Sequence, residues 1–317
     1  MRATVIIATF LVLGVSVARA RLQTDMQTPL HRHYLEVQGG AGTGGLGYEL
    51  IGGRTTAAPS FFFGAGYTWF FIPSAGFQTG VQLSYTGTTA VLTEPMEWRT
   101  WQDGSRLTDY MGEQYTHRAS FENWKEYQQI WQLQVPIGLR FRHFAAAHSR
   151  FGIHAGAGIL LSIPIRANYT LMSGEVTHTG WYEEWRLLLH DVPGRFETEP
   201  YARQKEPFSR YLRSVSITAY AEAGILIRLN ERSELSVGAY VHWMPQDLVS
   251  VKPAQRDPLG FSSERNGYSF MSAYHGIVGT DKTSAVHPWS VGVKAGFSFW
   301  PGKTAVQRKR CLCEGMQ

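Results

Sequence analysis

The feature that most constrains this chain is an uninterrupted alternation of apolar and polar residues over residues 131–142. Every odd position from Trp131 to Phe141 is apolar, and every even position as far as Arg142 is polar, glycine or proline. A period of two places these two sets on opposite faces of a β-strand. At about 3.3 Å per residue and a tilt near 45°, the segment rises roughly 28 Å, close to the apolar band of a membrane barrel. Soluble strands are usually about half as long. The segment is therefore predicted to be a membrane-crossing strand.

The same alternation recurs in other segments, so we expect an all-β fold, an eight-stranded antiparallel up-and-down transmembrane β-barrel with long extracellular loops. Phe62 and Phe70 break the polarity of their segment, and glycines leave the far end of the first strand uncertain. The other seven predicted strands are residues 35 to about 50, 61–71, 77–86, 151–165, 215–229, 235–243 and 289–299.

The connections between these segments alternate in length, as the two rims of such a barrel require. With the N-terminus in the periplasm, every long linker falls outside the cell and every short turn falls inside. The short turns are residues 72–75, 145–150 and 230–233, and the longer linkers are residues 51–60, 92–123, 168–213 and 245–287. An even number of strands returns the C-terminus to the periplasm.

Which strand face points outward is not determined by the pattern alone. A soluble exported β-barrel or sandwich binding an apolar ligand would place the apolar face inside. Six ions occupy the polar face, and burying them in a soluble core would cost several kcal/mol each unless all were paired. We therefore expect a lumen charge network of Glu36, Arg140, Arg142, Glu222, Arg228 and Lys294. We also expect interfacial aromatics at Trp69, Phe71, Trp131, Phe144, Trp243, Trp289 and Trp300.

The ends of the chain suggest export. Residues 1–20 have the form of a secretory signal peptide, with Arg2, an apolar stretch and cleavage near Ala20. Cleavage removes two arginines and lowers the formal charge from +5 to +3, too small an excess to name an anionic partner. The 17% of charged residues disfavours nucleic-acid binding. After residue 20, no apolar run is long enough for a transmembrane helix. We expect a periplasmic segment at 21–33, the barrel at 34–301 and a short periplasmic tail at 302–317.

Four stretches resemble the OmpA/PorT-like outer membrane β-barrel domain of Gram-negative bacteria. They are the glycine-rich residues 35–42, residues 64–67, residues 77–85 and the closing residues 288–299. The resemblance spans about residues 34–301 and implies an integral outer-membrane protein inserted by the barrel assembly machinery. In this family that machinery recognises a terminal strand ending in an aromatic residue. Here the strand ends at Phe299 and Trp300, and seventeen residues follow it.

The lumen has two interpretations. The charged residues could pair into a plug, or their cationic excess could line a narrow anion-preferring path. The long loops are rich in Trp, Tyr and charge, which favours recognition of a surface ligand that the sequence does not identify. We therefore predict a non-enzymatic barrel with a structural, surface-interaction or narrow-pore role, in contact with outer-membrane lipid and without nucleic acid.

An outer-membrane enzyme acting at the outer rim is the other alternative. His190 and Asp191 could form a base with its orienting carboxylate, with His178 in the same loop, but neighbours on an extended chain point to opposite faces. His31 with His33, or Cys311 with Cys313, supplies only two metal ligands. We expect no catalytic residue, metal or cofactor.

Overall fold

The computed structural model describes residues 32–301, apart from 101–104, 110, 147–148, 194–195, 202, 231, 251–256 and 264–269. The expected signal peptide, residues 21–31 and the tail with Cys311 and Cys313 lie outside the described residues. Residues Arg32–Pro301 form one compact unit. Within the described part of the chain, no helix is long and apolar enough to cross a membrane.

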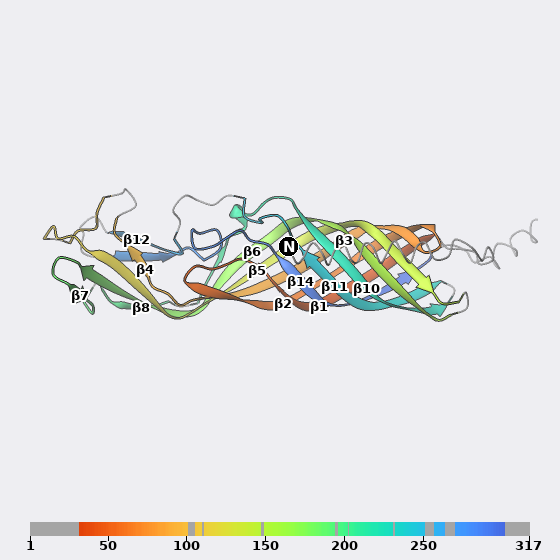
Figure 1. Ribbon diagram of the computed structural model, residues 1–317, viewed down its shortest axis with the longest axis horizontal. Coiled ribbons are helices and arrows are strands. Elements are labelled where there is room, and N and C mark those ends of the chain that lie inside the picture. Colours follow the sequence, from red (N-terminus) through yellow and green to blue (C-terminus); the bar gives the residue numbers. More distant parts are fainter. Residues whose placement is uncertain are drawn as a thin grey trace, which may run out of the picture. The chain divides into compact units, whose positions relative to one another are not determined.

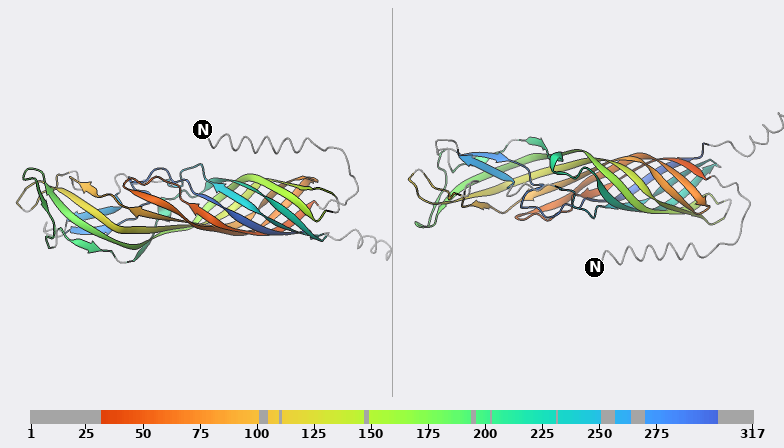
Figure 2. Two further views of the ribbon diagram at one scale, coloured as in Figure 1. Left: turned by 60° about the horizontal axis from the view of Figure 1, so that its bottom comes forward. Right: turned by 90° about the horizontal axis from the view of Figure 1, so that it is seen from above.

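Eight antiparallel strands form a closed ring (Figure 1 and Figure 2). The ring closes because β14, the last strand of the chain, pairs with β1, the first. Each strand otherwise pairs with its neighbour in the order of the ring. In that order the strands are β1 (His33–Gly45), β2 (Gly53–Ile72), β3 (Ala75–Leu92), β5 (Thr116–Phe144), β6 (Phe151–Tyr182), β10 (Ser216–Asn230), β11 (Ser233–Trp243) and β14 (Trp289–Phe299). The predicted eight-stranded up-and-down barrel is confirmed.

The outer face of the barrel is apolar and its interior is polar. Val37, Phe63 and Val293 are 60%, 55% and 67% exposed, whereas Glu36 and Lys294 on the opposite face are 1% and 2% exposed. A soluble barrel would hide its apolar side chains and expose its ions, because water solvates charge and disfavours apolar surface. This is the polarity of a transmembrane β-barrel, so the alternative of a soluble β domain with an apolar interior is wrong.

The two phenylalanines that broke the sequence pattern of β2 point into the lumen. Phe70 lies under the guanidinium of Arg142, whose Cζ is 3.8 Å from the ring centroid. Phe62 packs edge-on against Tyr240, with ring centroids 4.9 Å apart. Both rings therefore fill the barrel interior, and a cation over an aromatic face is a favourable contact.

Four strands extend much further than the alternation predicts. Of the predicted linkers, 51–60 becomes mostly β2, and both 92–123 and 168–213 contain long continuations of β5 and β6. The first strand, by contrast, ends at Gly45 rather than near residue 50. β5 and β6 have 29 and 32 residues, whereas about 9–11 residues suffice to cross a bilayer. The two strands therefore continue well beyond the membrane as a paired ribbon.

The sequence pattern changes where the ribbon leaves the membrane. Trp131 is the last apolar residue of β5 that faces outward, and the next residue towards the cell exterior, Ile130, is buried inside. The register between β5 and β6 shifts beside Trp131, and at this point Ile165 and Arg166 of β6 are both exposed. Beyond the shift, the inward positions of β6 fall on odd-numbered residues such as Tyr169. A β-bulge inserts one residue and so exchanges the two faces of the strand. Above the membrane the ribbon is apolar inside and polar outside, as in a soluble sheet.

Short strands and loops complete the extracellular part. β4 (Met96–Trp98) pairs with β5, and β7 (Leu187–Leu189), β8 (Thr198–Pro200) and β9 (Gln204–Pro207) pair with β6. A single 3₁₀ turn, η1 (Ser209–Tyr211), follows, and β12 (Leu259–Ser263) pairs with β13 (Phe270–Tyr274) as a separate hairpin. Figure 1 shows β4, β7, β8 and β12 gathered at the end of the ribbon opposite the barrel. We call this assembly of β4, β7, β8 and the outer halves of β5 and β6 the extracellular sheet.

Candidate functional site

The middle of the lumen is crossed by paired charges. Lys294 donates to Glu222 at 2.5 Å and to Gln38 at 2.8 Å, from three different strands. Arg140 forms an ion pair with Glu36. All five side chains are at least nine-tenths buried, so each charge is compensated inside the tube rather than by bulk water.

The periplasmic end of the lumen holds a second set of charges. Glu234 lies 3.6 Å from Arg142 and 3.7 Å from Arg228. Arg142 also donates from Nε to the carbonyl of Pro73 at 3.1 Å, which ties it to the turn between β2 and β3. Glu234 is absent from the predicted lumen charges because the predicted strand begins at Leu235, although Glu234 occupies an inward position of the same alternation.

Four of the six charged residues expected in the lumen are cations and two are carboxylates. Glu234 is a third carboxylate in the lumen. The structure brings together Arg140 with Glu36, and Lys294 with Glu222, as direct pairs. It places Arg142 and Arg228 beside Glu234 instead. The described lumen therefore has an excess of about one positive charge before His154 is counted.

Above the charges, aromatic rings and amides fill the lumen. Tyr240 and His242 have ring centroids 4.8 Å apart, and Phe62 contacts both. Gly138 provides the space for Tyr220, since a side chain at Gly138 would overlap the tyrosine hydroxyl. A ladder of hydrogen bonds, 2.8 to 3.3 Å long, then runs across β3, β5, β6 and β10 through Gln82, Gln134, Ser162 and Thr218.

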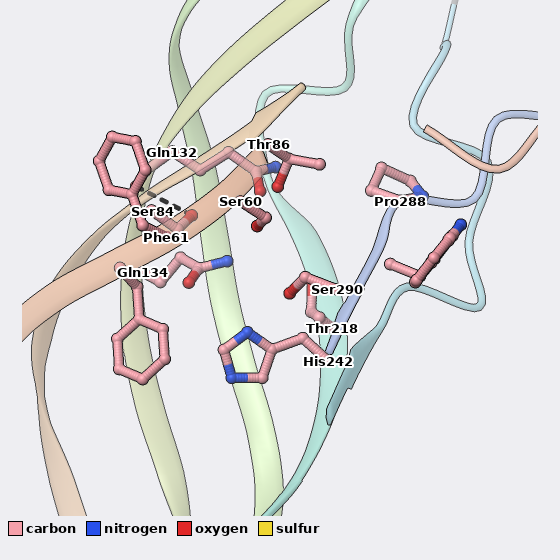
Figure 3. Close-up of a pocket in the computed structure, with 12 residues that line it drawn as sticks. Ser60, Phe61, Ser84, Thr86, Gln132, Gln134, Thr218, His242, Pro288 and Ser290 are labelled. Carbon is pink, nitrogen blue, oxygen red and sulfur yellow. Dashed lines mark hydrogen bonds between the residues drawn. The ribbon is translucent and has the colours of Figure 1, made fainter. Parts of the chain in front are cut away.

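A small polar hollow lies at this level (Figure 3). Its volume is about 20 Å³, and Figure 3 shows Ser60, Gln134, His242 and Ser290 converging on it. A space of that size holds about one water molecule. The hollow is therefore too small to admit a solute, and the charged layer closes the lumen beneath it.

The extracellular mouth is covered by an apolar core. Towards the cell exterior, the inward residues of β5 change from the polar Gln132 to the apolar Ile130. At the end of β11 they change from His242 to Met244. Ile130 and Met244 are both buried. The core combines the outer halves of the long strands with the loops between barrel strands. Its loop residues include Leu46, Leu50, Leu248, Ile277 and Val286.

One carboxylate is buried in this core. Glu126 is fully buried and accepts hydrogen bonds from Tyr274 at 2.5 Å, from Gln128 at 2.6 Å and from the amide of Ile277 at 3.2 Å. Tyr48 in turn donates to Gln128 at 2.8 Å. Burial, together with the carboxylate of Glu126, raises the pKa of Tyr274 well above 10.0. Tyr274 therefore stays protonated and donates its hydrogen bond. Glu126, a residue of β5, holds the loop that contains Ile277 against that strand through these hydrogen bonds.

A second cluster lies near the distal end of the extracellular sheet. It consists of Leu107, Tyr115, Tyr182 and Phe196, with the rings of Tyr115 and Tyr182 stacked at 5.5 Å. Beside it, His117 and His178 face each other across β5 and β6 at 2.9 Å.

Most of the expected interfacial aromatics lie near the two ends of the barrel. Trp243 and Trp289 are directly opposite each other on neighbouring strands, and Trp131 contacts Tyr85 at the same end of the barrel. Trp69 and Phe71 lie at the other end, 43% and 45% exposed, and Trp300 is partly exposed after the end of β14. Phe144 is the exception, because it follows the inward positions of β5 and lies 4.1 Å from the guanidinium of Arg228. Its assignment to the interfacial belt was wrong.

The candidate catalytic pair of the outer rim behaves differently from the expectation. His190 Nδ1 and Asp191 Oδ2 are 2.7 Å apart because Asp191 has a φ of 56°, which abolishes the strand geometry that would separate them. Their side chains are 63% and 78% exposed, in open solvent. His178 lies elsewhere, in the buried pair with His117. Among the described residues, no group of three His, Cys, Asp or Glu side chains is placed to hold a metal ion.

Comparisons with known proteins return architecture only. No family model matches the chain, and no curated protein sequence matches it. Among solved structures, the chain is similar to Neisserial surface protein A, with 9% identity over 84% of this chain and 96% of that one, at a TM-score of 0.33. It is similar to the outer membrane protein OprG from Pseudomonas aeruginosa, with 13% identity over 87% and 99%, at a TM-score of 0.31. It also matches the outer membrane protease OmpT from Escherichia coli, with 6% identity over 87% and 98%, at a TM-score of 0.26.

Proposed function

We propose that this chain is a non-enzymatic integral outer-membrane protein of a Gram-negative bacterium, and that its closed barrel carries the extracellular sheet into contact with partners outside the cell. The observation that carries this proposal is the continuation of β5 and β6 far beyond the membrane, with an apolar core of their own. A barrel that served only as a membrane anchor or pore would need neither strands that extend beyond the membrane nor a separate apolar core.

The lumen residues support the structural part of the proposal. Paired Glu36, Arg140, Glu222 and Lys294 act as a plug, with the aromatic layer and the apolar core above them. The outward belts of Trp69, Trp131, Trp243 and Trp289 anchor the barrel in lipid. Membership of the OmpA/PorT-like family, and insertion by the barrel assembly machinery through the terminal strand Trp289–Phe299, belong to the same proposal.

The test removes the distal end of the extracellular sheet, with β7 and most of β4, and leaves the barrel and the apolar core above it in place. Met96 is opposite Ala119, and the amide of His178 bonds to the carbonyl of Glu197 at 3.0 Å, so each pair can be joined by a tight turn. The shortened variant replaces residues 97–118 and 179–196 each with Asn-Gly, the preferred two-residue hairpin turn. A heat-dependent gel shift of the variant verifies that its barrel has closed.

Bacteria that produce either form are then placed on surfaces coated with cationic, neutral and anionic polypeptides, and on supported lipid bilayers. We expect cells with the full chain to be retained on at least one of these surfaces severalfold better than cells with the shortened chain. Equal retention on every surface, with both barrels closed, would refute a surface-contact role.

A further inference from the structure

The distal end of the extracellular sheet exposes apolar side chains far from the lipid. Trp185, Leu187 and Leu188 are 52%, 41% and 41% exposed, and Met111 on the neighbouring loop is 68% exposed. Trp131, at the outer end of the barrel, pairs with Arg166 of β6. The stretch of β6 from Arg166 to its end at Tyr182 spans roughly 50 Å at about 3.3 Å per residue. The protein's own membrane therefore does not cover these side chains.

The same end offers a strand edge. Among the strands of the described residues, β7 is the last on its side of the sheet, and it pairs with β6 through Leu187 opposite Tyr182 and Leu189 opposite Gly180. Its outer N–H and C=O groups therefore point away from the sheet. Such an edge is a template for another extended segment.

The local backbone holds this edge in place. Arg186 and Asp191, on either side of β7, have φ values of 50° and 56°, a conformation that costs a side-chain-bearing residue about 1 kcal/mol or more. The ring of Trp185 stacks on Tyr182 at 5.6 Å with an interplanar angle of 8°. The two positive φ values and the stacked rings thus define the shape of the hairpin that carries β7.

The charge around the edge is acidic although the chain as a whole is basic. In residues 105–115 and 181–199, seven residues are acidic and three, Arg106, Arg186 and Arg195, are basic. The seven are Asp109, Glu113, Glu183, Glu184, Asp191, Glu197 and Glu199. This excess of four negative charges repels anionic lipid and a second copy of the same edge, and it attracts a cationic partner.

We propose that the β7 edge binds an extended basic polypeptide segment by strand addition, with apolar side chains of the segment on the Trp185 and Leu188 surface and its cations beside Glu183 and Glu184. The proposal rests on the surface-contact function above and specifies its partner. Main-chain hydrogen bonds provide the affinity in this mode, and the alternate side chains and charges provide the selectivity.

The test uses three labelled twelve-residue peptides and the full-length protein in nanodiscs of zwitterionic lipid. One peptide alternates leucine with lysine, one alternates leucine with glutamate, and the third is the lysine peptide with N-methyl groups along one edge. We expect the lysine peptide to bind at least tenfold more tightly than either of the others, measured by fluorescence anisotropy. Empty nanodiscs and nanodiscs with the shortened chain measure binding to lipid and to the barrel.

Variants of the protein locate the site. Glu183→Lys with Glu184→Lys should weaken binding of the lysine peptide at least tenfold, and Trp185→Ser with Leu188→Ser should do the same. Two matched controls lie lower on the sheet, the exposed acidic pair Glu122→Lys with Glu175→Lys and the 49% exposed Met172→Ser. Both controls should leave the affinity within about twofold.

Each outcome distinguishes this proposal from the function on which it rests. Equal binding of the lysine and N-methylated peptides, or loss of affinity in the controls as well, would overturn strand addition at β7. Self-association of full-length protein with no peptide binding would replace the basic partner with a second copy. If cells with the full chain are still retained on another surface in that case, the surface-contact function stands and only this site is wrong.

Discussion

At the scale of single residues, the lumen depends on the compensation of buried charge. Lys294 lies 2.5 Å from Glu222, both are buried, and His154 is only 3.9 Å from the same carboxylate. Removing one member of a buried ion pair leaves the other without compensation, which costs far more than the net worth of the pair.

We therefore expect Lys294→Met to lower the free energy of unfolding by about 3–5 kcal/mol. Urea unfolding from lipid vesicles, followed by tryptophan fluorescence, measures the loss. Lys294→Met with Glu222→Gln should recover most of it, because the second change removes the uncompensated charge. An unchanged urea midpoint in the single variant would argue that the lumen is more hydrated than these contacts indicate.

The His117 and His178 pair makes the outer half of the extracellular sheet sensitive to pH. Burial lowers the pKa of His178 below 6.5, and the carboxylate of Glu199, 3.9 Å away, only partly opposes this. The rings of Trp98 and Phe196 lie 6.0 and 5.9 Å from the ring of His117. The unfolded chain takes up a proton near pH 6.5, whereas the folded chain does so only at lower pH, so the contribution to stability is full above about pH 6.5 and falls as the pH drops through that value.

Hydrogen exchange of the amides in residues 176–182, corrected for intrinsic rates, checks this expectation. Protection should fall between pH 7.5 and pH 5.5 in the full chain and fall much less in His178→Gln. Amides of β14 in the same sample serve as an internal reference. Equal pH dependence in both proteins would assign the effect to other groups.

At the scale of elements, the alternation of a strand reports the solvent on its outer face. β5 is a single strand, yet its pattern is apolar outside below Trp131 and apolar inside above it. The bulge beside Arg166 shifts the phase of the alternation on β6, and the positive φ of Asn123 marks a shift on β5. Because the alternation of apolar and polar residues changes there, a prediction based on one continuous alternation stops at the membrane boundary.

The elements stacked over the lumen also predict its conductance. Two barriers lie in series, the charged and aromatic layers inside the barrel and the apolar core above it. We expect no current steps in planar bilayers for the full chain or for the shortened variant, because the shortening leaves both barriers in place. Anion-selective steps in both proteins would favour the narrow-pore interpretation, and steps in the shortened variant alone would make the extracellular sheet a gate.

At the scale of the whole molecule, closure of the ring removes every edge within the eight barrel strands. Closed barrels of this kind have no frayed strand from which unfolding can begin. We expect the unheated protein to migrate in SDS as a compact species and the boiled protein to migrate near the mass of the mature chain, which is the 35.6 kDa of the full sequence less residues 1–20. Identical migration, with the protein in the soluble fraction, would contradict the outward assignment of the apolar face.

The amino-acid sequence by itself determined the number of barrel strands, the short turns and which charged residues share one strand face, because a period of two is a local property of the backbone. Tertiary structure decided which face met lipid, since two faces of one strand are equivalent until the ring closes. It also decided that Phe62, Phe70 and Phe144 point inward and that Glu126 is buried. These positions depend on residues brought together from distant strands. The extension of β5 and β6 beyond the membrane depended on the same long-range pairing, because there the two strands stabilise each other and their loops supply the core.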